Sequence, residues 1–224
     1  ILILIVGGVY LIYFKPAPSC TDNKKNQKET AIDCGGSCIP CEVKGVNLIT
    51  EKLEIFRASE NQVTLLAEIR NPNQDFTAAF TYTFELNGGT FNQSEKLEGK
   101  QTLTPGSAEY IVIPGVTTKD LEGFNFNFNI SNLTWSKSKS SMPDVKAVGQ
   151  AEFDEDTKTI AVKGTLSNNS AINFPSISLT AILFDRAGET LNASITRIEK
   201  VEAFSRRQFT IFFPKLIVIF KQTL

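Results

Sequence analysis

The chain has 224 residues, with 23 Lys and Arg against 24 Asp and Glu, so its formal net charge is -1. This balance, without a basic stripe interleaved with aromatic residues, argues against nucleic acid as a partner. The absence of histidine removes the usual general base and the commonest metal ligand, so we expect a protein that is not an enzyme. The 17 Phe, the single Met and the many Thr, Asn and Ser residues predict a mainly β fold.

The chain starts with an apolar, uncharged segment, with Tyr10 and Tyr13 near its end and Lys15 directly after it. An apolar body, an aromatic rim and then a charge are typical of a helix that leaves a bilayer. We therefore predict that residues 1–14 are a transmembrane helix, truncated at its N-terminus, in contact with membrane lipid. The predicted localisation is a single-pass cell-membrane protein with the bulk of the chain extracytoplasmic. A cleaved signal peptide and a buried strand or core helix are the alternatives.

Residues 15–19 are rich in proline and predict a short, stiff spacer. The next segment, residues 20–41, holds every cysteine of the chain: Cys20, Cys34, Cys38 and Cys41. Its apolar content is too small to hold it together by burial, so cross-links or a bound ion must replace a core. Two disulfides are the economical solution in an oxidising compartment, and all three pairings stay open. A zinc site of four thiolates is the alternative.

Oxygen-bearing side chains recur between the first two cysteines, at Asp22, Asn26, Glu29 and Asp33. Hard oxygen ligands on a short, turn-rich loop can hold Ca²⁺, so these four residues are a candidate calcium site. The alternative is that they are ordinary turn formers and solvated charges.

The cysteine segment resembles a bacterial cell-surface motif of the form C-x-D-G-x-x-N-G-x-E-T-x-x-D-C-G-G-x-C-x-x-C. The matching residues are Cys20, Asp22, Asn26, Glu29, Thr30, Asp33, Cys34, Gly35, Gly36, Cys38 and Cys41. Asn23 and Gln27 stand where the motif has glycine, so a turn that relies on positive φ is expected to be strained there; Asn tolerates that geometry, and Gln27 does so less readily. The resemblance implies an extracytoplasmic location and no particular activity.

Turn signals recur every eight to twelve residues or so after the cysteines, which predicts a first β-sandwich over residues 42–135. Its predicted strands are residues 63–69, 80–86 and 110–113, with turns at 70–73, 87–89 and 104–107. The strict alternation of 80–86 places four apolar side chains on one face, namely Phe80, Tyr82, Phe84 and Leu86. The alternating Phe124, Phe126 and Phe128 predict a further strand with its rings in this core, and an exposed aromatic strip for a partner is the alternative.

The same order of strand, Asn-rich turn, long strand and hairpin returns after about 97 residues, which predicts two homologous sandwiches. A polar linker is predicted at 136–144 and the second sandwich at 145–224. Its predicted strands are residues 160–166, 177–184 and 209–213, with turns at 167–170 and 185–188. Residues 215–220 are too few to span a bilayer and are predicted to be a strand that pairs with a neighbouring domain or chain.

The second module resembles the bacterial FxLyD type of immunoglobulin-like domain and, similarly, the water-stress domains of late-embryogenesis-abundant type 2. Phe184, Asp185 and Gly188, with a last strand before Pro214, carry this resemblance. The first module has Glu85-Leu86-Asn87 in place of the Phe-Asp pair. These families are generally not catalytic, so the resemblance implies no active site.

Taken together, these features predict a membrane-anchored extracytoplasmic scaffold or assembly subunit of the cell envelope. It would bind other envelope or surface proteins, itself included, through sandwich edges and loops. An adhesin or ligand-binding surface protein, with contacts on the loops at one end of a sandwich, is the second hypothesis. An enzyme that uses Asp154, Glu155 and Asp156 is the third, although a hairpin tip is the simpler position for these residues.

Overall fold

The computed structural model describes residues 19–88, 91–117, 125–137, 143–157, 159–213 and 222–223. The chain divides into two compact units, residues 1–46 and 47–224. The predicted single-pass membrane localisation requires correction, because no helix in the described ranges is long and apolar enough to cross a membrane. Residues 1–14, on which that prediction rested, lie outside the described residues.

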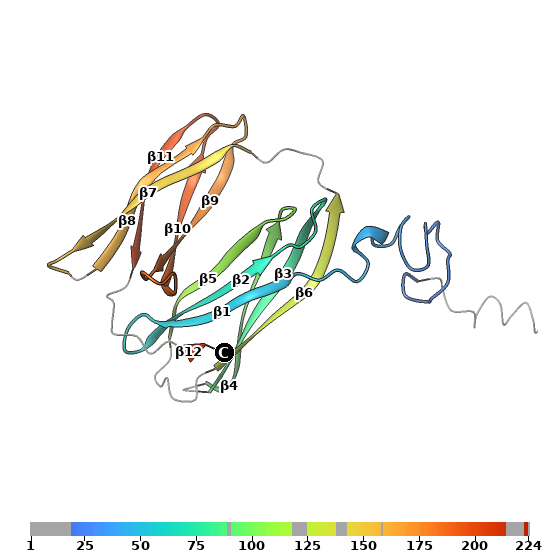
Figure 1. The fold of residues 1–224 in the computed structure, drawn as a ribbon, viewed down its shortest axis with the longest axis horizontal. Coiled ribbons are helices and arrows are strands. Elements are labelled where there is room, and N and C mark those ends of the chain that lie inside the picture. The colour runs from blue at the N-terminus through green and yellow to red at the C-terminus, as the bar shows by residue number, and fades with distance from the viewer. Residues whose placement is uncertain are drawn as a thin grey trace, which may run out of the picture. The chain divides into compact units, whose positions relative to one another are not determined.

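The first β region comprises the strands between residues 49 and 137, and all its strand pairs are antiparallel (Figure 1). One sheet has the order β12-β1-β2-β5 and the other has the order β4-β3-β6. The strands are β1 (Ile49–Arg57), β2 (Gln62–Arg70), β3 (Phe76–Gly88), β4 (Phe91–Leu103), β5 (Ala108–Thr117) and β6 (Asn125–Lys137). The short β12 (Gln222–Thr223) pairs with β1, where Glu54 lies opposite Thr223. Residues 215–220, predicted to be a strand, lie outside the described residues.

The core of the first β region takes side chains from both of its sheets. The alternation predicted for residues 80–86 is confirmed, because Phe84 and Leu86 are fully buried in this core and Tyr82 packs against it. The predicted packing of Phe126 and Phe128 is also confirmed: the ring centroid of Phe84 lies 5.6 Å from that of Phe126 and 5.0 Å from that of Phe128. Phe124 lies outside the described residues.

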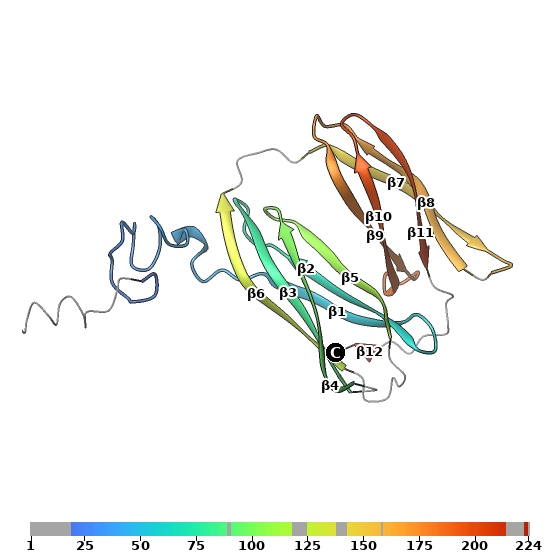
Figure 2. The same cartoon turned by 180° about the vertical axis from the view of Figure 1, so that it is seen from behind.

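The second β region comprises the strands between residues 145 and 213, seen from behind in Figure 2. Its described strands form one sheet of order β11-β8-β7 and a pair β10-β9, again antiparallel. The strands are β7 (Val145–Asp154), β8 (Thr159–Asn168), β9 (Phe174–Phe184), β10 (Thr190–Val201) and β11 (Arg206–Phe213). Its core cluster draws on both groups of strands, with Leu166 and Phe213 at its centre.

A smaller apolar cluster joins the two β regions inside the unit 47–224. It places Phe56, Leu66 and Val112 against Ala193, with Ile182 at its margin. Beside it, the ammonium of Lys52 donates a hydrogen bond to the hydroxyl of Thr190 over 3.1 Å.

The predicted strands that fall within the described residues are confirmed in position, and the structure extends most of them by several residues at one end or both. The predicted boundaries move in two places. Cys41–Val43 forms a 3-10 helix, η1, and the unit boundary falls after Val46 rather than after Cys41. Ser136 and Lys137, predicted to begin the linker, are the last residues of β6.

Each β region turns its chain around one fully buried asparagine. The amide nitrogen of Asn71 donates to the carbonyls of Phe76 (2.8 Å) and Thr104 (3.0 Å), and its amide oxygen accepts the N–H of Asn73 (3.0 Å). A buried polar group needs hydrogen-bond partners. The side-chain amide finds them in the backbone of neighbouring turns and strands, and so holds these segments together.

Asn168 repeats this arrangement in the second β region. Its amide nitrogen donates to the carbonyls of Ile172 and Glu202, both over 2.8 Å, and its oxygen accepts the N–H of Ser170. The repeat inferred from the sequence therefore extends to individual hydrogen bonds.

Candidate functional site

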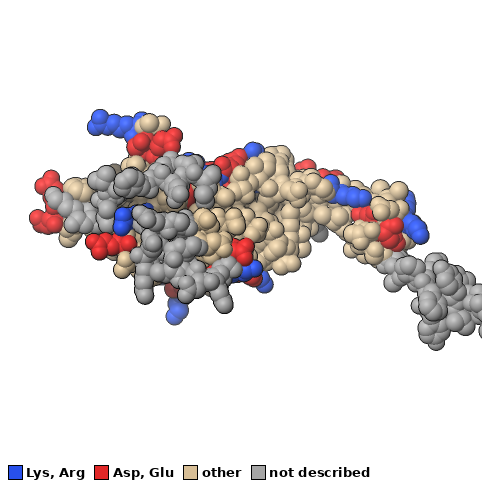
Figure 3. All heavy atoms as spheres, turned by 90° about the horizontal axis from the view of Figure 1, so that it is seen from below, with Lys and Arg blue, Asp and Glu red and all other residues tan. Residues whose placement is uncertain are grey.

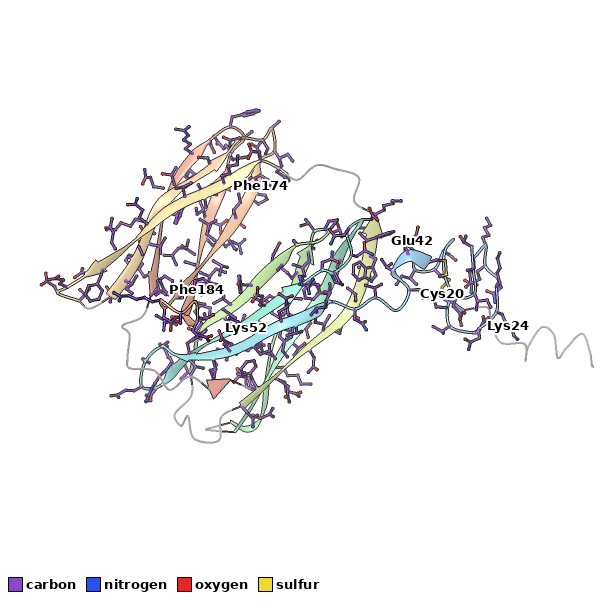
Figure 4. The ribbon with its side chains drawn as sticks, in the orientation of Figure 1. Cys20, Lys24, Glu42, Lys52, Phe174 and Phe184 are labelled. Atoms are coloured by element: carbon purple, nitrogen blue, oxygen red, sulfur yellow. A yellow bond between two sulfur atoms is a disulfide. The ribbon has the colours of Figure 1, made fainter. Side chains whose placement is uncertain are left out.

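The cysteine segment contains two interlaced disulfides, as predicted. Cys20 is bonded to Cys38, with Cα atoms 5.6 Å apart, and Cys34 is bonded to Cys41, with Cα atoms 4.9 Å apart. Figure 4 shows the yellow disulfide bond beside Cys20. Since all four sulfur atoms are in disulfides, none is available as the thiolate ligand that the zinc alternative requires.

The turns of this segment depend on left-handed backbone conformations. Both residues that stand in place of the motif's glycines have positive φ, Asn23 with 59° and Gln27 with 49°. A Cβ on Gly35 would overlap the side chain of Thr30, and a Cβ on Gly36 would overlap the carbonyl of Lys28. The two glycines therefore let this part of the chain lie directly against residues 28–30.

Two buried carboxylates take the place of a hydrophobic core in this unit. Glu29 and Asp33 are each 5% exposed. One oxygen of Glu29 accepts the backbone N–H groups of Asn26 and Asp33, both over 3.1 Å, while the carboxylate of Asp33 accepts the N–H of Asn23 over 3.1 Å. Charge-assisted bonds to backbone donors are strong, so these carboxylates stabilise turns whose N–H groups have no regular secondary structure.

The half-buried Asp22 belongs to the same network. Its carboxylate accepts a hydrogen bond from the side-chain amide nitrogen of Asn26 over 2.7 Å and one from the backbone N–H of Lys24 over 2.9 Å. The hydrogen bond from Asn26 is the main cause that lowers the pKa of Asp22 below its ordinary value. The carboxylate is therefore held in its charged form.

The predicted calcium residues are neighbours, but their carboxylates do not converge on one point. Among the described residues, the ligand-type side chains that meet within 4.8 Å as a group of three are Cys20, Glu29 and Cys38. Cys20 and Cys38 are bonded to each other in one disulfide. The oxygens of Asp22, Glu29 and Asp33 are directed to N–H donors, which matches the alternative of turn formation better than a calcium shell.

The predicted hairpin tip at Asp154, Glu155 and Asp156 is confirmed, since these residues end β7 and lead into β8. The carboxylate of Asp154 accepts the N–H groups of Asp156 (2.9 Å) and Thr157 (3.0 Å). The backbone N–H of Thr157 is the main cause that lowers the pKa of Asp154. This geometry of Asp154 is that of a turn cap.

The described surface includes two shallow hollows. One, of about 300 Å³, lies beside the second disulfide, between Thr30, Gly36 and Glu42. The other, of about 340 Å³, is on the second β region and is lined by Phe174, Pro175, Lys200 and Glu202 among others. Both offer surface for contact with another molecule, and neither gathers a nucleophile with a base among its described lining residues.

Exposed apolar side chains are concentrated on the second β region, which the sequence did not reveal. Val148 and Phe204 are each 73% exposed and Phe212 is 69% exposed, whereas the first β region exposes Ile49 alone among its described large apolar side chains, at 39%. The other exposed members are Phe153, Ile172 and Phe184. Alternation in a strand tells which side chains share a face, but it does not tell whether another element covers that face.

Charged side chains do not form a patch of one sign on the face drawn in Figure 3, where basic and acidic groups are interspersed with uncharged surface. The fold and the cysteine segment together define a mainly β protein with a disulfide-linked N-terminal unit. No protein-family model and no curated protein matches the chain.

Proposed function

We propose that this protein is a non-enzymatic assembly or scaffold protein that binds other proteins through the edges and faces of its β regions. The observation that carries the proposal is the contrast in apolar exposure between the two β regions. Isolated exposed apolar residues are common on protein surfaces, but several on one small region indicate a surface that is covered by a partner.

We also infer the finer architecture from this arrangement. Each β region is an immunoglobulin-like β-sandwich, of which the FxLyD type is the nearest resemblance. The shared core of sheets β12-β1-β2-β5 and β4-β3-β6 supports this inference. The buried asparagine corners at Asn71 and Asn168 support a common origin of the two modules.

The disulfide-linked unit fits the same role. Its likeness to the bacterial surface motif is supported by the two disulfides and by the left-handed turns at Asn23 and Gln27. Disulfides persist in oxidising surroundings, so the proposed partners are proteins of an oxidising compartment. The unit itself contributes rigidity, since cross-links limit the freedom of a segment that has little core.

Site-specific photo-cross-linking in the source cells tests this proposal. A photoreactive amino acid is placed at Phe212 or Phe204, with Lys100 and Glu98 on the exposed side of β4 as matched control positions. We expect cross-links to other polypeptides from Phe212 and Phe204 and far fewer from the controls. Equal labelling at all four positions, or none at any, contradicts the proposal.

A ligand-binding surface protein is the second candidate, and Phe204 is the observation that favours it. This residue is 73% exposed and has a φ of 53°, a conformation that is costly for a side chain with a bulky ring. It lies in the loop between β10 and β11, close in sequence to the hollow residues Lys200 and Glu202. In this case Phe204 would cross-link while Phe212 would not.

A further inference from the structure

The disulfide between Cys20 and Cys38 closes the loop that carries the polar network of the N-terminal unit. The two cysteines are 18 positions apart in the sequence, and Glu29 lies within the loop that they close. Since this unit has little apolar core, opening the bond would release the turns that Glu29 stabilises. The unit therefore depends on this bond for its fold.

Neither cysteine of this disulfide is fully buried. Cys20 and Cys38 are both half-buried, whereas Cys34 of the second disulfide is only 4% exposed. Cys38 also lines the hollow of about 300 Å³ beside Thr30 and Gly36. A hollow of this size admits a small thiol, so burial alone does not keep thiolates away from Cys38.

A carboxylate oxygen lies against the sulfur of Cys38. Oε1 of Glu29 is 3.2 Å from Sγ of Cys38. Because this sulfur is in a disulfide, it has no hydrogen to donate, and the two atoms form a contact between a carboxylate and a disulfide. The other oxygen of Glu29 accepts the backbone N–H groups of Asn26 and Asp33, which fixes the direction of the carboxylate. The negative charge is thus held beside the bond.

The charge of Glu29 is weakly screened. The neighbouring Asp33 lies 3.9 Å from the ammonium of Lys44, but the Lys and Arg side chains that the structure describes form no ion pair with Glu29. Glu29 is also only 5% exposed, so water has little access to it. The electrostatic field of this carboxylate therefore reaches the sulfur of Cys38 almost undiminished.

Reduction of a disulfide by thiols brings a negative charge to one sulfur and leaves one on the other. A thiolate attacks one sulfur and forms a mixed disulfide with it, and the other sulfur leaves as a thiolate. A second thiolate then releases the attacked cysteine, so the two reducing thiols lose two electrons and become a disulfide. Attack on Cys38 brings the incoming thiolate up to Glu29, and attack on Cys20 leaves Cys38 as a thiolate beside Glu29. Both routes place two negative charges together, so both are slowed.

We propose that Glu29 protects the Cys20–Cys38 disulfide against thiol–disulfide exchange through its negative charge. One oxygen of the carboxylate holds the backbone N–H groups of the turns, and the other protects the bond that closes them. The protection acts against small thiols and protein thiols alike, since both attack as thiolates. It makes no use of the β regions and is a property beyond the proposed assembly role.

The rate at which dithiothreitol reduces the full chain tests this role. Freed thiols are alkylated at intervals, and peptide mass spectrometry assigns them to one disulfide or the other. Glu29→Gln keeps an oxygen that accepts the backbone N–H groups but removes the charge, so the Cys20–Cys38 bond should open about tenfold faster than in the parent.

Asp33→Asn is the matched control for this measurement. Asp33 is as buried as Glu29 and also accepts a backbone N–H, but its charge lies near Lys44. Its replacement should change the rate by less than about twofold. Equal acceleration in the two variants would show that loosening of the turns opens the bond, and no acceleration in Glu29→Gln would show that its charge is irrelevant. Either result overturns the proposal.

The charge of the attacking thiol provides a second measurement that needs no variant. Cysteamine and mercaptoethanesulfonate are small thiols whose other end is cationic and anionic, respectively, and they are compared at equal thiolate concentration. At the Cys20–Cys38 bond of the parent, cysteamine should react several-fold faster, and added salt should reduce this difference. Glu29→Gln should lose most of the preference, and Asp33→Asn should keep it. Equal rates with the two thiols in the parent overturn the proposal, whether or not Glu29→Gln forms both disulfides.

Discussion

Strands β1 to β5 of the first region and β7 to β11 of the second pair in the same order, and both regions have the same buried asparagine corner, yet they differ in how completely they bury their apolar side chains. In the first, Phe84 and Leu86 of β3 are fully buried. In the second, Leu179 and Leu183 of β9 are only partly buried. The difference corresponds to β6, which lies beside β3 and has no described counterpart beside β9.

The regions also differ in how they accommodate glycine in a strand. Gly99 lies opposite Tyr82, whose phenol group occupies the space of the missing side chain. Gly164 lies between Gly149 and Phe209 across three strands, and a Cβ there would overlap the carbonyl of Val148 as well as the ring of Phe209. A flexible side chain can move aside, but a neighbouring backbone cannot do so without disturbing the sheet.

The largest expected effect comes from truncation of a core aromatic. Phe84→Ala removes a fully buried ring that contacts Phe126 and Phe128, so the free energy of unfolding should fall by about 3–5 kcal/mol. Phe212→Ala, at a 69% exposed position, should change it by less than about 0.5 kcal/mol. Urea titration followed by the fluorescence of Trp135 reports on the first β region, and circular dichroism reports on both. Equal losses for the two variants would show that the contrast in burial is wrong.

The second largest effect tests the repeated corner. Asn71→Ala leaves the carbonyls of Phe76 (buried) and Thr104 (half-buried) without their donor and should cost about 2–3 kcal/mol of unfolding free energy. Asn168→Ala should cost a similar or slightly smaller amount, because its carbonyl partners are partly exposed. Urea unfolding curves measure both, with the exposed Asn169→Ala as control. A neutral result for either asparagine means that the corner is not a shared structural element.

The third effect separates the two kinds of strand glycine. Gly164→Ala forces the backbone near Val148 and the ring of Phe209 to shift, so we expect a loss of about 1–3 kcal/mol. Gly99→Ala should cost less than about 1 kcal/mol, since the end of the Tyr82 side chain can move. The unfolding temperatures of the two variants and the parent, measured at one pH, compare these losses of stability. A larger loss for Gly99→Ala would contradict the distinction.

The smallest effect is electrostatic and concerns the first β region. Burial raises the pKa of Glu109, although a hydrogen bond from Gln101 over 2.5 Å opposes this shift. Because the folded state favours the neutral carboxyl group, this residue supports folding fully below its ordinary pKa of 4.5 and loses that contribution as the pH rises through the raised value. Glu109→Gln should therefore gain stability relative to the parent at neutral pH and lose this advantage below pH 4.5. Urea midpoints across this pH range measure the effect, and exposed Glu98→Gln should show no such dependence.

Local pattern was sufficient for most of the fold. Alternation predicted the buried face of β3, turn residues predicted the hairpin at Asp185 and Gly188, and self-similarity predicted the second β region. These features depend on neighbours along the chain, and the period of a strand records which side chains share a face. The disulfides followed from cysteine density, but their pairing did not, since it depends on which Cα atoms the turns bring within reach.

The tertiary structure decided the properties that depend on what lies across a sheet or beside it. The roles of Asn71 and Asn168 follow from carbonyls up to 34 residues away in sequence, so composition alone showed only an Asn-rich turn. The carboxylates of Glu29 and Asp33 accept hydrogen bonds from backbone N–H groups because the folded chain brings those groups near, and the spacing of the two residues in the sequence did not predict this. The sequence by itself determined which residues of β9 alternate. Only the tertiary structure showed how far these side chains are buried, because burial is set by neighbours that sequence periodicity does not specify.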